Sequence, residues 1–168
     1  MNEPPIVADA GPLIGLARIG LLSLLQDLYG TVVIPTAVSV ELRTIEDRPG
    51  SRALLKALEE GWLQPEEIRP SGDLEILLQV LGRGEAEAIL LADQRPCRFL
   101  FLDEKRGRAV ARRRGIQVVG TGGILLAAKQ KGLLDSVSPV LDRLAAAGYR
   151  LSLDLRAEVL RRAGEDES

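Results

Sequence analysis

The sequence predicts an α/β domain with a mostly parallel central sheet. Short apolar runs of strand character alternate with segments of helical periodicity, which is the pattern of parallel strands joined by helices. The chain has 168 residues, the size of one domain, and 46 % of them are hydrophobic, enough for a substantial core. No internal repeat or linker divides it, so we expect one domain over residues 1–164 and a loose C-terminal tail over residues 165–168.

The N-terminal part of the chain predicts a βαβ unit. Ile6–Ala8 is an apolar run that ends at Asp9, before a Gly-Pro pair that cannot continue a sheet. Two short amphipathic helices, broken at Gly20, lead to a second strand over Thr31–Ile34, which Pro35 ends. A crossover of this kind joins parallel strands in a right-handed sense.

The rest of the chain continues this alternation. Thr36 is placed to cap a helix that runs through Ile45. The elements expected after it are, in order, a helix over 52–60 stopped by Gly61, a proline-bounded connector over 62–70 with room for one edge strand, helices over 74–81 and 85–93, a strand over 99–102, a basic helix over 104–114, a strand over 116–119, a helix from the glycine-rich turn 120–123 through residue 129, and helices over 140–147 and 154–163.

Composition limits the chemistry that is available. Histidine is absent, which excludes histidine triads, histidine general bases and histidine zinc sites. The net charge of −2 argues against a protein that coats nucleic acid through bulk positive charge. If the protein is an enzyme, carboxylates must therefore carry much of its chemistry.

The sequence also favours one cellular location. Cys97 is the only cysteine, so no disulfide framework is expected. No apolar run approaches the length of a membrane span, and the first residues lack the basic and apolar regions of a signal peptide. We therefore expect a cytoplasmic protein without a membrane partner.

Four carboxylates are placed to meet at one edge of the sheet. Asp9 and Asp103 follow strand-like runs, and ligands collect at the carboxyl ends of the strands in open α/β sheets. Glu41 and Glu85 fall on the apolar stripes of their helices, whereas Glu87 faces elsewhere. Acids crowded in this way repel one another unless a cation neutralises them, and oxygen-only ligands suit Mg²⁺ or Mn²⁺.

Each of these acids also has an ordinary structural explanation. Asp9 precedes Gly-Pro and is a good turn former, and Glu85 lies in a first helical turn, where the helix dipole favours acids. Glu41 is a surface residue if its helix is turned differently, and Asp103 with Glu104 is the start of the next helix. The combination is harder to explain in this way than any single residue.

The chain resembles PIN-domain proteins of the branch that contains VapC-type toxin ribonucleases. The resemblance runs, in order, through the blocks IVADAGPLIGLARIG, VVIPTAVSVEL, GRGEAEAILLA, FLFLDEKRGRAVARRRGIQVVGTGGILLAAKQKGLL and VLRRAGE. It implies a three-layer α/β/α PIN-like fold in which acids from separate segments bind Mg²⁺ or Mn²⁺ and cleave RNA. It also implies a homodimer and a small antitoxin protein whose tail blocks the site.

The resemblance also assigns roles to individual residues. The metal-binding acids of the family and a supporting hydroxyl match, in order, Asp9, Glu41, Glu85, Asp103 and Thr121. Two positions depart from the family's pattern. Gly11 lies where relatives often carry a hydroxyl shortly after the first aspartate, and Glu104 replaces a second aspartate, so Glu104 is either a further ligand or only a helix acid.

A basic helix begins beside Asp103. Its residues Lys105, Arg106 and Arg108 are placed to contact RNA phosphates, whose geometry suits arginine. The alternatives are a solvated outer helix or a surface that docks an acidic partner. The three consecutive arginines at 112–114 fan over most of the helix circumference, so they cannot all face one site.

The principal hypothesis is a Mg²⁺- or Mn²⁺-dependent endoribonuclease that acts as the toxin of a toxin–antitoxin pair. The main alternative is a catalytically weak or inactive PIN-fold module that binds RNA or protein. A response-receiver domain would need a lysine after the last strand, where the chain has only the turn 120–123, GTGG. A nucleotide-binding protein would need more than this one glycine-rich turn.

Overall fold

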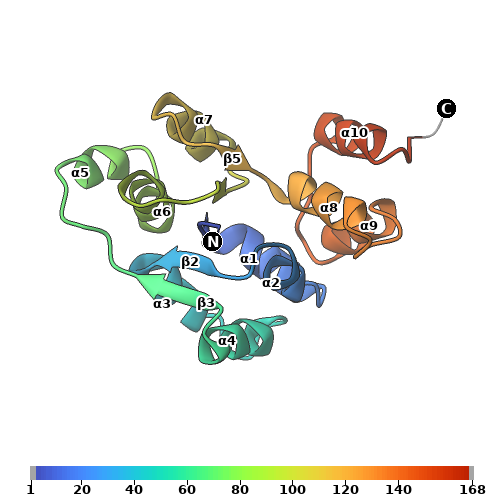
Figure 1. Cartoon of the computed structure of the whole chain (residues 1–168), viewed down its shortest axis with the longest axis horizontal. Coiled ribbons are helices and arrows are strands. Elements are labelled where there is room, and N and C mark those ends of the chain that lie inside the picture. Colours follow the sequence, from blue (N-terminus) through green and yellow to red (C-terminus); the bar gives the residue numbers. More distant parts are fainter. Residues whose placement is uncertain (1–2, 167–168) are drawn as a thin grey trace.

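The computed structural model describes residues 3–166 and confirms a three-layer α/β/α fold (Figure 1). One five-stranded sheet has the order β3-β2-β1-β4-β5, and every neighbouring pair of strands is parallel. The strands are β1 (Ile6–Ala8), β2 (Val32–Pro35), β3 (Leu63–Glu66), β4 (Leu100–Phe101) and β5 (Val118–Val119).

Helices cover both faces of this sheet. They are α1 (Ala10–Arg18), α2 (Ser23–Tyr29), α3 (Thr36–Arg43), α4 (Ser51–Glu60), α5 (Asp73–Leu78), α6 (Arg83–Gln94), α7 (Lys105–Arg113), α8 (Thr121–Gln130), α9 (Ser138–Ala146) and α10 (Leu153–Arg162). Successive strand residues point to opposite faces. Ile6 and Ala8 therefore lie in the larger core cluster, with residues of α1, α2, α4, α8 and α9, whereas Val7 lies in the smaller one, with α5, α6 and α7.

Most of the predicted elements are confirmed. The connector 62–70 contains the predicted edge strand, β3. Strands β4 and β5 are shorter than predicted, because each has two residues rather than four. Two local predictions are wrong. The helix expected over 74–81 ends at Leu78. Thr36 does not cap α3, because Pro35 is its N-cap and Thr36 is its first helical residue. The cap comes from another helix instead, because a carboxylate oxygen of Glu87 in α6 accepts a hydrogen bond from the N–H of Ala37 at 3.2 Å.

No single helix among residues 3–166 is both long and apolar enough to cross a membrane. Helices α1 and α2 meet those criteria only when they are taken together, and they are bent by 116° relative to each other. Both bury their apolar residues in the larger core cluster.

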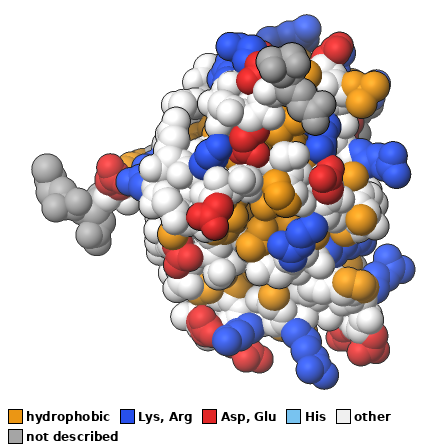
Figure 2. All heavy atoms as spheres, turned by 90° about the vertical axis from the view of Figure 1, so that its right-hand side faces the viewer, with side chains coloured by type: hydrophobic (Ala, Val, Ile, Leu, Met, Phe, Trp, Pro, Cys, Tyr) orange, Lys and Arg blue, Asp and Glu red, His pale blue; other side chains and the backbone are white. Residues whose placement is uncertain are grey.

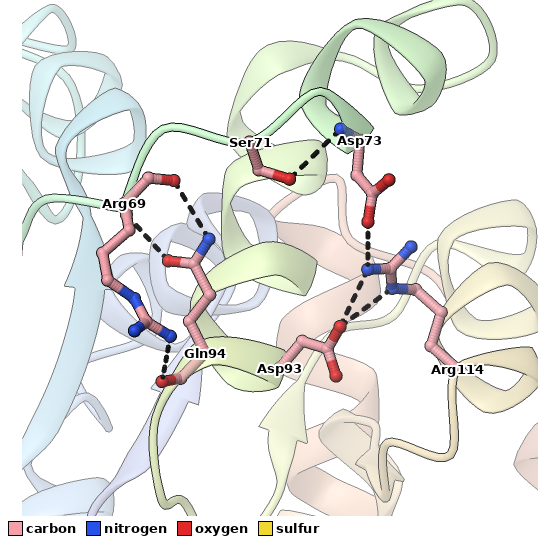
Figure 3. A network of polar contacts seen from close by, with 6 residues as sticks. All are labelled: Arg69, Ser71, Asp73, Asp93, Gln94 and Arg114. Carbon is pink, nitrogen blue, oxygen red and sulfur yellow. Dashed lines mark hydrogen bonds and ion pairs between the residues drawn. The ribbon is translucent and has the colours of Figure 1, made fainter.

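A polar network fixes the segment between β3 and α5 against α6 (Figure 3). The side chain of Gln94 pairs with the backbone of Arg69, since its Oε1 accepts from the N–H at 2.8 Å and its Nε2 donates to the carbonyl at 3.0 Å. At the end of α7, the Arg114 guanidinium donates to Asp73 at 2.9 Å and to Asp93 at 2.8 Å. Arg114 therefore ties α5, α6 and α7 together.

Glu165, which the sequence assigns to a loose tail, is held against the start of α9. Its carboxylate accepts hydrogen bonds from the N–H groups of Val137 at 2.8 Å and Ser138 at 2.9 Å, and it pairs with Lys129 at 2.8 Å. The free N–H groups of a helix start attract an acid. Of the expected tail, residues 167–168 lie outside the described part of the chain.

We expect Glu165→Gln to lower the free energy of unfolding by about 1–3 kcal/mol at pH 7. Burial raises the pKa of Glu165, but the contacts with Lys129, Ser138 and Val137 outweigh it and lower the pKa to about 2. The stabilisation is therefore complete above about pH 4.5 and is lost as the pH falls toward 2. Urea unfolding of both proteins at pH 7 and pH 3 should show a smaller difference at pH 3.

The exposed neighbour Asp166 provides the control for this prediction. Asp166→Asn should change the free energy of unfolding by less than about 0.5 kcal/mol. An equal cost of Glu165→Gln at both pH values would show that the carboxylate charge is not what stabilises α9.

Candidate functional site

A cleft of about 1000 Å³ lies at the carboxyl edge of the sheet. Its lining includes residues that follow β1, β4 and β5, among them the acids Asp9, Asp103 and Glu104, and Glu85 from α6. A separate hollow of about 690 Å³ is lined by residues 46–52 and Leu55 and contains none of the predicted site residues. The candidate site is therefore the cleft at the strand ends, as expected for an open α/β sheet.

Asp9 has an unusually high pKa for a carboxylate. It follows β1 directly, is the N-cap of α1, and is 9 % exposed. The pKa of Asp9 is raised to about 7, mainly by burial, and the hydrogen bond from the N–H of Ala10 lowers it in part. The carboxylates of Glu85, Glu41 and Asp103 raise it further. Near neutral pH, Asp9 therefore carries only part of a negative charge unless a cation lies beside it.

Helices α3 and α6 bring Glu41 close to Asp9. A Cβ atom placed on Gly84 of α6 would lie 3.5 Å from Asp9 Oδ1 and 3.9 Å from Glu41 Oε2. The prediction that Glu41 projects from a buried apolar stripe is wrong, because Glu41 is exposed while Val38 and Leu42 face the core. Glu41 thus lies beside Asp9 but is not among the residues that line the cleft.

Glu85 presents a buried oxygen without a partner. Among the described residues, its Oε2 has no hydrogen-bond partner and is shielded from solvent. Burial, followed by the charges of Glu104 and Glu41, raises the pKa of Glu85. A Cβ atom on Gly107 of α7 would lie only 2.8 Å from this oxygen. A buried acceptor without a partner is costly, so the atom suits either a proton or a cation.

Glu87, two residues further along α6, has a structural role. It is 7 % exposed, and its carboxylate caps α3 and pairs with Arg83 at 3.2 Å. Glu87 faces elsewhere than Glu85, as the helical spacing predicts, although every residue of α6 from 86 to 92 is buried. Glu85 is nevertheless the acid that lines the cleft.

Asp103 is held by three hydrogen bonds at the start of α8. The N–H of Thr121 donates to its Oδ1 at 2.8 Å, and the hydroxyls of Thr121 and Tyr149 both donate to its Oδ2. Thr121 therefore lies where the family resemblance implies a supporting hydroxyl. The sequence gives no signal for the contact of Tyr149, an isolated tyrosine 46 residues from Asp103.

The acids suit a divalent cation by their chemistry, although they do not form a finished metal site. Carboxylate oxygens are the donors that Mg²⁺ and Mn²⁺ prefer, and Glu85 Oε2 lacks a partner. Within residues 3–166, however, no group of three or more Asp, Glu or Cys residues is close enough to hold a metal ion. Burial disfavours the charged forms of Asp9 and Glu85, and a cation would stabilise both carboxylates.

Basic residues line two walls of the cleft. Lys105, Arg108 and Arg112 come from α7, and Arg150 and Arg162 come from the loop before α10 and from α10 itself. Of the predicted phosphate contacts, Lys105 and Arg108 thus lie in the cleft. Arg106 does not line the cleft, and its guanidinium donates to the carbonyl of Val80, just after α5, at 3.3 Å.

Comparison with known proteins gives the family. No curated protein matches the sequence. A family model described as PIN domain matches residues 5–165, which is nearly the whole chain. Together with the parallel sheet and the acids at its carboxyl edge, this match shows that the chain belongs to the PIN-domain family.

Proposed function

We propose that this protein is a Mg²⁺- or Mn²⁺-dependent endoribonuclease. PIN domains are typically nucleases, and this supports the reaction class. The observation that carries the proposal is the buried, unpartnered Oε2 of Glu85, which lies in a cleft with Asp9 and Asp103. A divalent cation would stabilise the charge of carboxylates in such surroundings.

The acids take separate roles in this proposal. Asp9 and Glu85 hold the cation, and Glu41 and Asp103 complete the site directly or through water. When bound, the cation supplies Lewis acidity for hydrolysis of an RNA phosphodiester and stabilises the charge that develops there. Glu104 lies at the mouth of the site as the N-cap of α7, where its charge raises the pKa of Glu85.

The basic walls of the cleft hold the RNA strand on either side of the acids. Lys105 and Arg108 contact phosphates from α7, as the sequence predicts. Arg112, rather than Arg106, is the third phosphate contact from this helix. Arg150 and Arg162 contact the strand from the opposite wall. The molecular face over α8 to α10 shows acidic and basic side chains interspersed (Figure 2), so we confine RNA binding to the cleft.

We further propose that the protein is the toxin of a toxin–antitoxin pair, acting in the cytoplasm as a homodimer. The resemblance to VapC-type ribonucleases supports this role. In that arrangement a small antitoxin protein places its tail in the cleft and blocks the acids. Growth arrest on expression is the cellular consequence that this role requires.

A catalytically weak or inactive PIN module is the second candidate function. It is favoured by the absence of a finished metal site among residues 3–166 and by the three hydrogen bonds that occupy Asp103. Gly11 also lacks the hydroxyl that relatives often carry. Such a module would bind RNA or a protein through the same cleft without cutting it.

Cleavage of RNA by the purified protein separates the two candidates. With Mn²⁺ present we expect cleavage that EDTA stops, and Asp103→Asn should reduce kcat/KM by about 100-fold or more because it removes one of the site's negative charges. Asp142→Asn serves as a control, since Asp142 lies on α9 in an exposed pair with Arg156. Full cleavage by Asp103→Asn would contradict the proposed mechanism, and no cleavage of any RNA tested by the wild-type protein would favour the binding module.

A further inference from the structure

Tyr149 is held in place from three sides. Helix α9 is followed by Gly148 in the left-handed region, with φ of 92°, and the N–H of Tyr149 donates to the carbonyl of Leu144 at 2.8 Å. The ring then packs over Gly15 of α1, where an added Cβ atom would lie 3.0 Å from Tyr149 Cδ2. The hydroxyl reaches across to Asp103. A turn, a ring contact and a hydrogen bond thus all place this side chain.

The hydrogen bonds leave Asp103 with one free acceptor position. A carboxylate offers about four, two on each oxygen. The hydroxyls of Thr121 and Tyr149 fill both positions on Oδ2, and the N–H of Thr121 fills one on Oδ1. The remaining position is on Oδ1, which lies next to Gly120 in the wall of the cleft. An added Cβ atom on Gly120 would be 2.7 Å from Oδ1 and 2.7 Å from Arg108 Nη1.

We propose that Tyr149 is a positioning residue for Asp103. Its hydroxyl, together with that of Thr121, fixes Oδ2 so that Asp103 presents only Oδ1 to a divalent cation in the cleft. This inference rests on the proposed function, because it requires a divalent cation to bind beside Asp103. A carboxylate fixed in advance loses less rotational freedom when it binds, and partners that orient metal ligands typically change metal affinity 10- to 100-fold.

The test is Mn²⁺ binding to purified Tyr149→Phe, measured by titration calorimetry. Phenylalanine keeps the ring that packs over Gly15 and removes only the hydroxyl. We expect the dissociation constant for Mn²⁺ to rise by about 10-fold or more. Tyr29→Phe is the matched control and should bind as the wild type does, because Tyr29 packs edge-on against Phe99 and does not line the cleft.

The possible outcomes separate this inference from the proposed function. If the wild type binds Mn²⁺ and Tyr149→Phe binds it equally well, the hydroxyl has only a structural role and the inference is wrong. Tighter binding by Tyr149→Phe would also overturn it, since the hydroxyl would then compete with the cation. If the wild type binds no Mn²⁺, the proposed function fails first and the inference fails with it. Thermal unfolding of each protein without metal shows whether the folded state is kept.

Discussion

Asp9→Asn is expected to lower kcat/KM for RNA cleavage by at least about 1000-fold. Asp9 is the acid that β1 carries to the edge of the sheet. It is buried near three other acids, so a bound cation would stabilise its charge. Asparagine keeps the size of the side chain and is equally suited to the N-cap of α1, so the fold should persist. In cells, the same substitution should relieve growth arrest on expression of the protein.

Asp27→Asn is the matched control for this prediction, because Asp27 is exposed on α2 and does not line the cleft. It should cleave RNA and arrest growth as the wild type does. Circular dichroism of both variants establishes that they are folded. Cleavage by folded Asp9→Asn at more than about a tenth of the wild-type rate would remove Asp9 from the mechanism.

The same substitution should stabilise the metal-free protein at alkaline pH. Burial raises the pKa of Asp9 in the folded state to about 7 from an ordinary value of 3.8. The folded protein therefore binds a proton more tightly than the unfolded chain does, and wild-type stability falls as the pH rises from about 4 through 7. Asparagine cannot ionise, so Asp9→Asn should unfold with a free energy about 2–4 kcal/mol higher than the wild type at pH 8 and nearly the same at pH 4.

Urea unfolding in EDTA between pH 4 and pH 8 measures this difference. Most of this difference develops above about pH 4.5, where the stabilisation by Glu165 is complete, so the two effects can be distinguished. Adding Mn²⁺ at pH 8 should raise the stability of the wild type and leave Asp9→Asn unchanged. A stability difference that does not vary with pH would show that the charge of Asp9 is not what destabilises the folded protein.

The fold could be predicted from the sequence because its signals are local. The apolar runs that end at Asp9 and Asp103, the glycine that stops α4 and the leucine spacing of α5 depend only on neighbouring residues. The capping of one helix by a residue of another helix is not a local signal. Glu87 caps α3 from a position 50 residues away, and this contact exists only after the chain has folded.

The candidate site shows the same division. The strand-end acids lie at the cleft, as the sequence predicts, since the carboxyl ends of parallel strands always share an edge. The exposure of Glu41 contradicts its predicted face, and the burial of Glu87 has no signal in the sequence, because helical periodicity does not show how far a helix is buried on its other sides. Tyr149 lies on a loop whose path is set by the packing of α9, so its contact with Asp103 left no pattern in the sequence.

The central claim is that the acids of the cleft hold a divalent cation. Mn²⁺ binding to wild-type protein and to Asp9→Asn, followed by electron spin resonance of the free ion, tests it without any assumption about the RNA. We predict that the wild type binds Mn²⁺ and that Asp9→Asn reduces the affinity by at least about 100-fold. Equal binding by the two proteins, or no binding by the wild type, would contradict the claim.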